Sequence, residues 1–251
     1  MLNNEKLKLA YQNALEFEKK EELIGIQQEK ILHKTIKYYL DFDESHHEVK
    51  IKKSSKGIIY ADIYDGNTIY EIQTRGFDKL REKLKELLNF YNVVLVHPIA
   101  YKKNIYKIEE TGEIVGPIKS PKKGSIFEIF KELYKIKFLL NEPNLSIKII
   151  LCDMDEYRYV VVKKHYRSSG YIRERQIPTN IVSEIDLNSI EDFKQLLLTF
   201  GLIDNFTSTD FARKTKITRQ RAATALNVLT YMSVVERIGK EKNSYIYQIK
   251  K

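Results

Sequence analysis

The stretch DIYDGNTIYEIQ, residues 62–73, restricts the possible folds more than any other part of the sequence. Ile and Tyr recur at alternate positions along both of its arms, which is the spacing of an antiparallel strand pair. The pair Gly66-Asn67 between the arms suits a two-residue hairpin loop. Yet Asp62, Glu71 and Gln73 occupy positions where a strand ordinarily carries Val, Ile or Tyr. The presence of these three polar residues in the hairpin therefore requires a physical explanation.

The loop length decides how the two carboxylates face each other. A two-residue loop places Asp62 directly opposite Glu71, with Cβ atoms about 4.5–5.5 Å apart, and alternation puts Gln73 on the same face as Glu71. If the loop also includes Asp65, the carboxylates become diagonal neighbours. Like charges this close destabilise a sheet, and a divalent cation that prefers oxygen ligands, Mg²⁺ or Mn²⁺, removes the conflict. The alternative is a solvent-exposed sheet face on which both carboxylates are hydrated.

The segments around the hairpin predict an α/β fold, with a mixed sheet flanked by helices. Residues 5–40 have a helical spacing of apolar residues, with an interruption at Gly25, and residues 76–91 form an amphipathic helix. Strands are expected at residues 47–53, 57–65, 68–74 and 93–100.

The middle of the chain is less regular. A hairpin is expected over residues 104–120 with its turn at Thr111-Gly112, and Ser125 with Glu128 fits a helix capping box. Residues 146–164 predict one or two strands, and the basic residues 165–177 a loop or ribbon.

Charge and composition narrow the class of partner. The 251-residue chain has a formal net charge of +9, which favours a polyanionic partner, nucleic acid before a membrane. It lacks an apolar run of the length that a membrane helix needs, and its charged N-terminus does not look like a signal peptide. The single cysteine, Cys152, excludes an intramolecular disulfide and a zinc site built on several cysteines. We therefore expect a protein of the prokaryotic cytosol or nucleoid.

Residues 20–100 resemble the PD-(D/E)XK nuclease superfamily, whose core is a helix, a three-strand meander, a second helix and a further strand. Asp62 matches the motif Asp on the second strand. Glu71-Ile72-Gln73 matches the Glu-x-Lys of the third strand, with Gln in place of Lys, a replacement that certain restriction endonucleases of the superfamily share. The resemblance implies a restriction-endonuclease-like fold and metal-dependent phosphodiester hydrolysis.

The same resemblance implies roles for individual residues. Asp62 and Glu71 would bind one or two Mg²⁺ (or Mn²⁺) ions together with the scissile phosphate, and Gln73 would hold the attacking water. Some branches of the superfamily add a metal-ligating or orienting Glu on the first helix, for which Glu29 is the candidate. The alternative for Glu29 is an ordinary surface carboxylate.

The C-terminal residues 186–251 have a different character and resemble a winged helix-turn-helix. Three helices are expected, capped in part by Thr207 or Ser208 and by Thr218, and then a hairpin that would be the wing. From residue 207 onward there are ten Lys or Arg residues against three Asp or Glu residues. The residues that would reach phosphates and base edges are Arg219, Gln220, Arg221, Thr224, Asn227, Lys240 and Lys242. Winged helices also mediate protein contacts, which is the alternative for this segment.

These patterns together predict a nuclease domain over residues 1–185 and a winged-helix DNA-binding domain over residues 186–251. We expect a Mg²⁺-dependent endodeoxyribonuclease of restriction, mobile-element or defence type, which acts on duplex DNA, has no membrane partner and is a possible homodimer. One rival hypothesis is a DNA-binding regulator with a degenerate nuclease fold, which the Gln at position 73 supports. The other is a structure-specific or RNA-acting nuclease.

Overall fold

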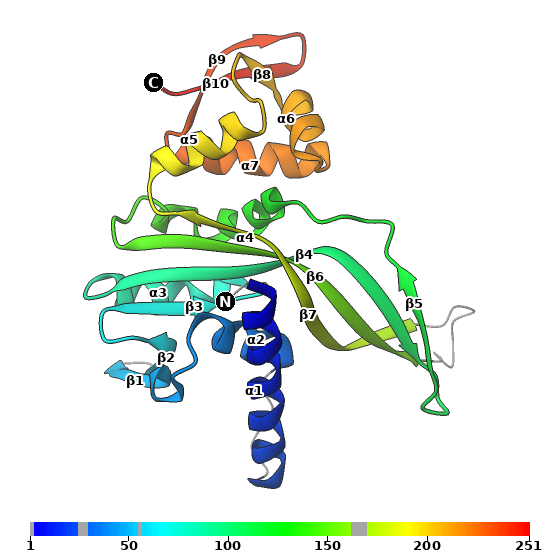
Figure 1. Cartoon of the computed structure of the whole chain (residues 1–251). Helices are drawn as coiled ribbons and strands as arrows, with labels where there is room; N and C mark the ends of the chain where they lie inside the picture. Colours follow the sequence, from blue (N-terminus) through cyan, green and yellow to red (C-terminus); the bar gives the residue numbers. More distant parts are fainter. Residues whose placement is uncertain (1–2, 25–29, 55–56, 162–169) are drawn as a thin grey trace. The chain divides into compact units, whose positions relative to one another are not determined.

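The computed structural model of the protein describes residues 3–24, 30–54, 57–161 and 170–251 (Figure 1). It is a mixed α+β structure with one mixed sheet flanked by helices, as the sequence predicts, and a second, three-stranded sheet. The larger sheet has the strand order β1-β2-β3-β4-β6-β7, with β5 paired to β4, and the smaller has the order β8-β10-β9.

The elements follow in chain order. The N-terminal helices are α1 (Asn3–Ile24), α2 (Ile31–Leu40) and η1 (Glu44–His46). The strands of the larger sheet are β1 (His47–Ser54), β2 (Gly57–Tyr64), β3 (Thr68–Ile72), β4 (Asn92–Ile108), β5 (Ile114–Lys119), β6 (Leu145–Val161) and β7 (Gly170–Leu187). The helices between these strands are η2 (Phe77–Leu80), α3 (Arg81–Leu88), η3 (Ile126–Ile129), α4 (Phe130–Leu133) and η4 (Tyr134–Leu139). The C-terminal elements are α5 (Ile190–Thr199), β8 (Phe206–Thr207), α6 (Ser208–Thr215), α7 (Arg219–Tyr231), β9 (Val235–Glu241) and β10 (Ser244–Ile249).

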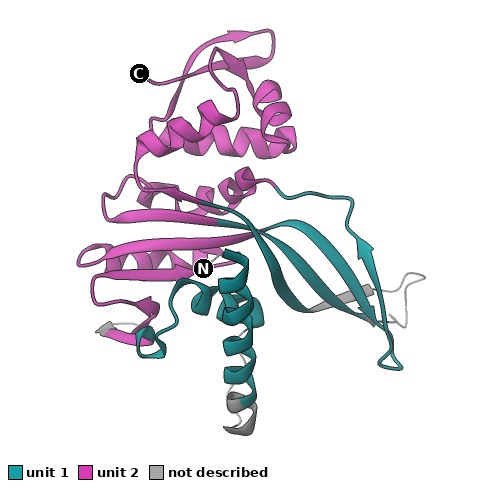
Figure 2. Ribbon diagram, viewed as in Figure 1, with its two compact units in different colours: residues 1–47, 100–124, 150–184 teal, residues 48–99, 125–149, 185–251 magenta. Residues whose placement is uncertain are grey.

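The chain divides into two compact units, each made of separate segments (Figure 2). The first, unit 1, contains residues 1–47, 100–124 and 150–184. The second, unit 2, contains residues 48–99, 125–149 and 185–251. The C-terminal helices thus fall in the same unit as the β2–β3 hairpin.

The core of unit 2 is built around the β2–β3 hairpin and the helix that follows it. β3 pairs antiparallel with β2 and parallel with β4. The parallel pairing is possible because η2 and α3 return the chain to the end of the sheet where β3 began. The inner side chains of α3 and of the strands exclude solvent almost completely; they include Ile63, Ile69, Leu84, Leu87, Val93 and Leu95.

In unit 1 the helices α1 and α2 pack on each other and on β7. The phenol of Tyr39 on α2 donates a hydrogen bond to Glu184 (2.6 Å), and the backbone N–H of Ile181 donates one to Asn4 on α1 (2.9 Å). Helical stretches on both sides of Gly25 were expected from the apolar spacing of residues 5–40, whereas their pairing was not. Ile36 and Ala10, which belong to that spacing, are fully buried.

Two expectations for the middle of the chain need correction. The apolar strand expected over residues 93–100 continues to Ile108, because it forms the first arm of the predicted hairpin. The basic segment expected as a loop or ribbon is strand β7 from Gly170 onward, while residues 162–169 lie outside the described residues. Residues 145–161 form one strand, β6, which is one of the two outcomes expected for this segment. Charged residues alternate with apolar ones in β6 and β7, and for this reason the full length of these strands, 17 and 18 residues, was not recognised from the sequence.

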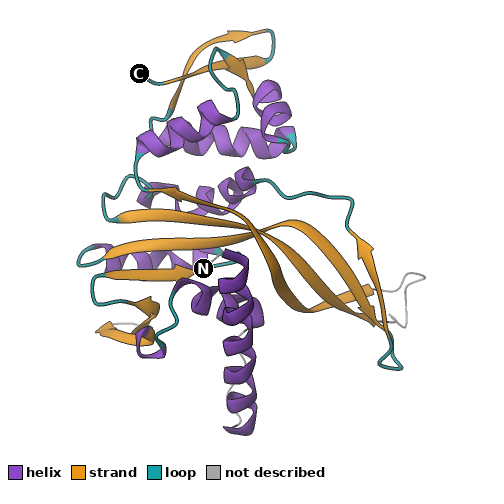
Figure 3. Ribbon diagram, in the orientation of Figure 1, coloured by secondary structure: helices purple, strands orange, loops and turns teal. Residues whose placement is uncertain are grey.

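The C-terminal elements match their predicted positions, with a hairpin after three helices (Figure 3). Thr207 caps α6 in a reciprocal capping box with Asp210, and Thr218 caps α7 through the N–H of Arg221. The short strand β8 pairs with β10 and joins the hairpin to the helices. Of the helices that the structure describes, none has the length and apolarity to span a membrane.

Candidate active site

The register of the β2–β3 hairpin decides where its carboxylates lie. Tyr64 pairs with Ile69 and Ile63 pairs with Tyr70, so the loop is the two-residue one predicted from Gly66-Asn67. Continuing this register by one residue on each strand places Asp62 opposite Glu71. The register predicted from the sequence is therefore confirmed for the two pairs at the loop.

Asp62 is half-buried on β2, and its carboxylate is fixed to the neighbouring strand. The Oδ2 atom accepts a hydrogen bond from the backbone N–H of Ile72 at 2.7 Å. In a regular sheet the N–H of Ile72 would instead donate to a backbone carbonyl of the neighbouring strand. This bond holds the Asp62 carboxylate beside Glu71.

Glu71 is buried on β3, with only 2% of its surface exposed. Its Oε2 atom lies 2.6 Å from Nζ of Lys83 on α3, and within the described part of the chain its buried Oε1 atom has no hydrogen-bond partner. Burial raises the pKa of Glu71 to about 8; the negative charge of Asp62 adds to this effect, and Lys83 opposes it. The site therefore holds a carboxyl group whose charge is poorly compensated by the protein alone.

The pair of carboxylates can hold a divalent cation. A Mg²⁺ ion is typically bound through one or two carboxylates, with water and substrate phosphate completing six oxygen ligands. The buried Oε1 atom of Glu71, for which the described residues supply no hydrogen bond of ordinary length, and the nearby Asp62 fit that requirement. Within the described residues no cluster of three or more His, Cys, Asp or Glu side chains has the arrangement of a metal site.

The segment after β3 is held by hydrogen bonds to two buried side chains. The backbone carbonyl of Gln73 contacts Nδ1 of His97 at 2.5 Å, and Glu132 accepts the N–H groups of Gly76 and Phe77 at 2.8 and 3.2 Å. The side chain of Gln73 is half-buried. His97 thus has a structural place beside the candidate site, and the backbone that carries Gln73 is fixed.

Lys83 is the residue of this site that the sequence analysis missed. The amphipathic helix was defined by its leucines, and Lys83 lies three residues after Leu80 and four before Leu87, on the same stripe. A lysine on the buried stripe of a helix needs an acidic partner. That position is the signal by which the residue could have been found.

One further candidate acid, Glu29, is not placed, and the two histidines before β1 have structural partners. Glu29 lies outside the described residues, so the structure gives no position for it. His46 contacts Asp41 through Nδ1 at 2.6 Å, and His47 contacts the Asp41 carbonyl through Nε2 at 3.0 Å. Both histidines therefore brace the turn that precedes β1.

The structure separates the predicted DNA-contacting residues of α7 into two groups. Arg219 and Gln220 are exposed. Arg221 forms an ion pair with Glu128 on η3 at 2.8 Å, and Asn227 accepts a hydrogen bond from Lys137 on η4 at 3.1 Å. Through these two residues α7 contacts η3 and η4, and it also packs on α4 and α6 of the same unit. Thr224 donates to the carbonyl of Gln220 at 3.2 Å and is half-buried.

The C-terminal hairpin presents a basic and aromatic face. Lys240 and Lys242 are exposed, as a phosphate-contacting role requires. The guanidinium of Arg237 lies 4.4 Å from the ring centre of Tyr245, and Nζ of Lys240 lies 5.8 Å from it. Arg237 and Tyr245 were absent from the sequence-based candidates, although alternating basic and aromatic residues in the hairpin were a visible signal.

Comparison with known proteins gives a family without an assigned activity. An uncharacterized protein of Treponema pallidum (strain Nichols) is 29% identical over 163 residues, which cover 65% of this chain and 61% of that relative. The chain thus matches less than two thirds of that relative's length. No solved structure matches the chain. A family model matches residues 30–188, well over half of the chain, and the protein therefore belongs to the family described as "Domain of unknown function (DUF8091)".

Proposed function

We propose that the protein is a Mg²⁺-dependent endonuclease that hydrolyses phosphodiester bonds in DNA. The observation that carries this proposal is the buried Glu71 carboxyl, whose pKa is raised in part by the charge of the nearby Asp62 and which lies 2.6 Å from Lys83. The order of the elements around this pair supports a restriction-endonuclease-like core, in which an antiparallel hairpin, a helix and a parallel strand follow each other.

The chemistry follows from the charges at the site. A bound divalent cation would lower the pKa of a coordinated water and offset negative charge on the phosphate. Asp62 and Glu71 would hold the cation, and Gln73 would accept a hydrogen bond from the attacking water. Because the backbone of Gln73 is fixed by His97, its side chain starts from a defined position.

Lys83 supplies the positive charge that the Gln at position 73 lacks. An ammonium group that contacts Glu71 can also donate to the water or to a phosphate oxygen next to that carboxylate. The replacement of the motif lysine by Gln73 is therefore no obstacle to catalysis, because a second lysine reaches the same carboxylate from α3.

DNA is the substrate that the charge distribution favours. The net charge of +9 and the exposed basic residues of the C-terminal elements suit a polyphosphate. The three helices and the hairpin support a winged-helix arrangement, in which Arg219, Lys240 and Lys242 would contact phosphates. Arg221 and Asn227 contribute less to this interface, because they already bind residues of η3 and η4.

The deciding experiment is a cleavage assay with duplex, single-stranded and branched DNA and with RNA, in Mg²⁺ or Mn²⁺, with a chelator as control. Wild type should cut DNA only with metal, and the variants Asp62→Ala and Glu71→Ala should lose cleavage while remaining folded. The exposed Asp204→Asn serves as the matched control and should cut like wild type. Full activity of either site variant would overturn the proposed site. Tight DNA binding without cleavage would favour a DNA-binding regulator.

A further inference from the structure

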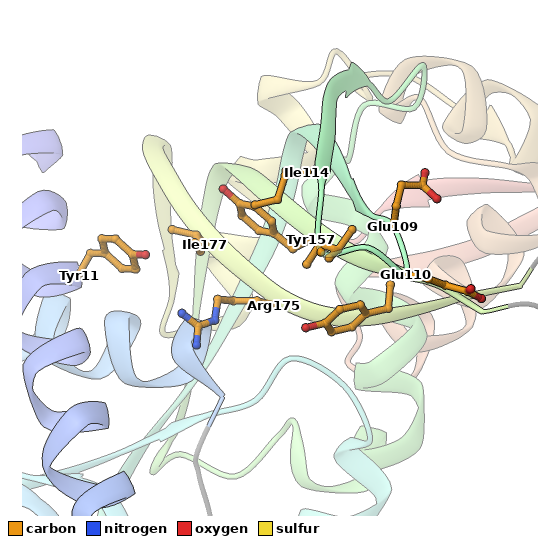
Figure 4. A pocket seen from close by; sticks show the side chains of 10 residues that line it. Tyr11, Glu109, Glu110, Ile114, Tyr157, Arg175 and Ile177 are labelled. Atoms are coloured by element: carbon orange, nitrogen blue, oxygen red, sulfur yellow. The ribbon is translucent and has the colours of Figure 1, made fainter.

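Unit 1 contains a hollow of about 740 Å³ that the nuclease chemistry does not use. It is formed by residues of α1, of β6 and β7, and of the hairpin between β4 and β5 (Figure 4). Its lining includes Tyr11, Ile108, Tyr157, Tyr159, Arg175 and Ile177. A hollow of this volume is large enough for a small organic ligand.

The walls of this hollow are aromatic and branched aliphatic side chains. The rings of Tyr106 and Tyr157 are stacked, with centres 4.8 Å apart and planes at 11°, so Tyr157 is held in a fixed plane. Tyr159 is more than a third exposed although its ring is large. Flat, partly exposed rings beside isoleucines favour a planar, largely apolar ligand.

The charged groups of the hollow disfavour a phosphate. Among the described residues of the lining the basic one is Arg175, and its guanidinium is engaged by both carboxylate oxygens of Glu18 at 3.2 and 3.3 Å. Glu109 and Glu110 add two carboxylates at the end of the hollow away from Tyr11 (Figure 4). Negative charge therefore exceeds positive charge among these four residues.

Hydrogen-bonding groups are nevertheless available at both ends. Burial raises the pKa of Tyr11 and of Tyr157, so their hydroxyl groups remain protonated and can donate. The carboxylates of Glu109 and Glu110 can accept from amino groups. The hollow thus offers flat walls, hydroxyl donors and carboxylate acceptors.

We propose that this hollow binds an unpaired nucleobase. A base is planar and uncharged, it stacks on tyrosine rings, and its ring nitrogens and exocyclic amino groups match the hydroxyl and carboxylate groups. The phosphates attached to the base would remain outside the hollow, away from the end that carries Glu109 and Glu110. The inference rests on the proposed function in one respect only, since it takes the base to come from the nucleic acid that the protein acts on.

The test uses 2-aminopurine, a fluorescent adenine analogue, because the chain contains no tryptophan to interfere. The full-length protein with Asp62→Ala is titrated against three probes: the free 2-aminopurine riboside, a single-stranded oligonucleotide with one 2-aminopurine, and the same oligonucleotide fully paired. Stacking quenches the fluorescence. We expect saturable quenching with the single strand and little with the duplex, and quenching of the riboside alone would assign the hollow to a soluble nucleoside instead of a strand.

Variants locate the binding. Tyr157→Ala and the more exposed Tyr159→Ala should each weaken binding about tenfold or more, Tyr159→Phe should retain it, and Tyr134→Ala in unit 2 should have no effect. Equal affinity of wild type and both alanine variants would overturn the proposal, as would competition by inorganic phosphate at equal ionic strength. Because binding is measured without cleavage, base binding by a protein that cuts no DNA would refute the nuclease and leave this site standing.

Discussion

Lys83 and Glu71 come from a helix and a strand, and their Nζ and Oε2 atoms lie 2.6 Å apart. The carboxylate is almost completely buried, whereas about a quarter of the lysine side chain is exposed. A buried charge without a partner is costly, so this pair fixes α3 on the sheet at the candidate site. The lysine thereby has both a structural and a chemical role, and variants can separate the two.

Lys83→Met should reduce cleavage by about 10²-fold or more, since a positioned proton donor or charge contributes on that order. Lys83→Arg should recover part of the rate because it restores the positive charge. Lys85, two residues further along α3, pairs with Glu82 at the surface. The variant Lys85→Met is therefore the matched control and should cut DNA normally. Initial cleavage rates at saturating DNA, with circular dichroism to confirm folding, check this. An unimpaired Lys83→Met protein would exclude the lysine from the chemistry.

Gln73→Ala should slow cleavage and leave DNA affinity nearly unchanged, because the side chain is proposed to orient water and not to contact the backbone of DNA. Gln73→Lys restores the usual motif, and we expect it to be active. Single-turnover rates and binding isotherms for the same substrate distinguish the two effects. A Gln73→Ala rate equal to wild type would remove the residue from the mechanism.

Above about pH 8, where Glu71 with its pKa of about 8 is ionised, Asp62→Asn should raise the stability of the metal-free protein by up to about 1 kcal/mol, because it removes one of two neighbouring negative charges. The amide oxygen can still accept the N–H of Ile72, so the strand contact is retained. Urea unfolding in chelator measures the change. A decrease in the free energy of unfolding would show that the carboxylates do not repel each other.

Acid should destabilise the protein through His97. Burial lowers the pKa of His97 in the folded state, whereas the unfolded side chain keeps its usual pKa of about 6.5. Below pH 6.5 the unfolded chain therefore binds a proton that the folded chain does not, and the free energy of unfolding falls until the folded pKa is reached. Urea midpoints at pH 7.5 and 5.5 should differ more in wild type than in His97→Gln. An equal difference would assign the acid sensitivity to other groups.

Arg219 and Arg221 should respond differently to replacement, although they are two residues apart. Arg219→Ala should weaken duplex binding and reduce its dependence on salt, as expected for an exposed phosphate contact. Arg221→Ala should instead lower the free energy of unfolding by up to about 1 kcal/mol, since it removes the ion pair with Glu128. Binding isotherms at several salt concentrations, together with urea unfolding, check both. Identical salt slopes for wild type and Arg219→Ala would remove Arg219 from the DNA interface.

Local rules predicted the hairpin register, the helix caps and the C-terminal elements, because turns and caps depend on neighbouring residues. The two-residue loop, one of the two loop lengths that the sequence allowed, brings Asp62 and Glu71 near each other. Lys83 was missed because its partner is twelve residues away, on another element. Likewise, the sequence of α7 shows an apolar stripe and a polar side, but not that η3 and η4 cover part of the polar side.

The aromatic cluster beneath the C-terminal helices has a consequence for how such a chain can evolve. Phe127 packs against Phe200 and Phe211, with ring centres 4.8 and 5.4 Å apart, and Phe130 packs against Phe193 at 6.3 Å. The family model ends at residue 188, between the two halves of this cluster. Loss or replacement of the C-terminal segment during evolution would therefore expose the rings of Phe127 and Phe130 to solvent. These two residues would have to change together with that segment.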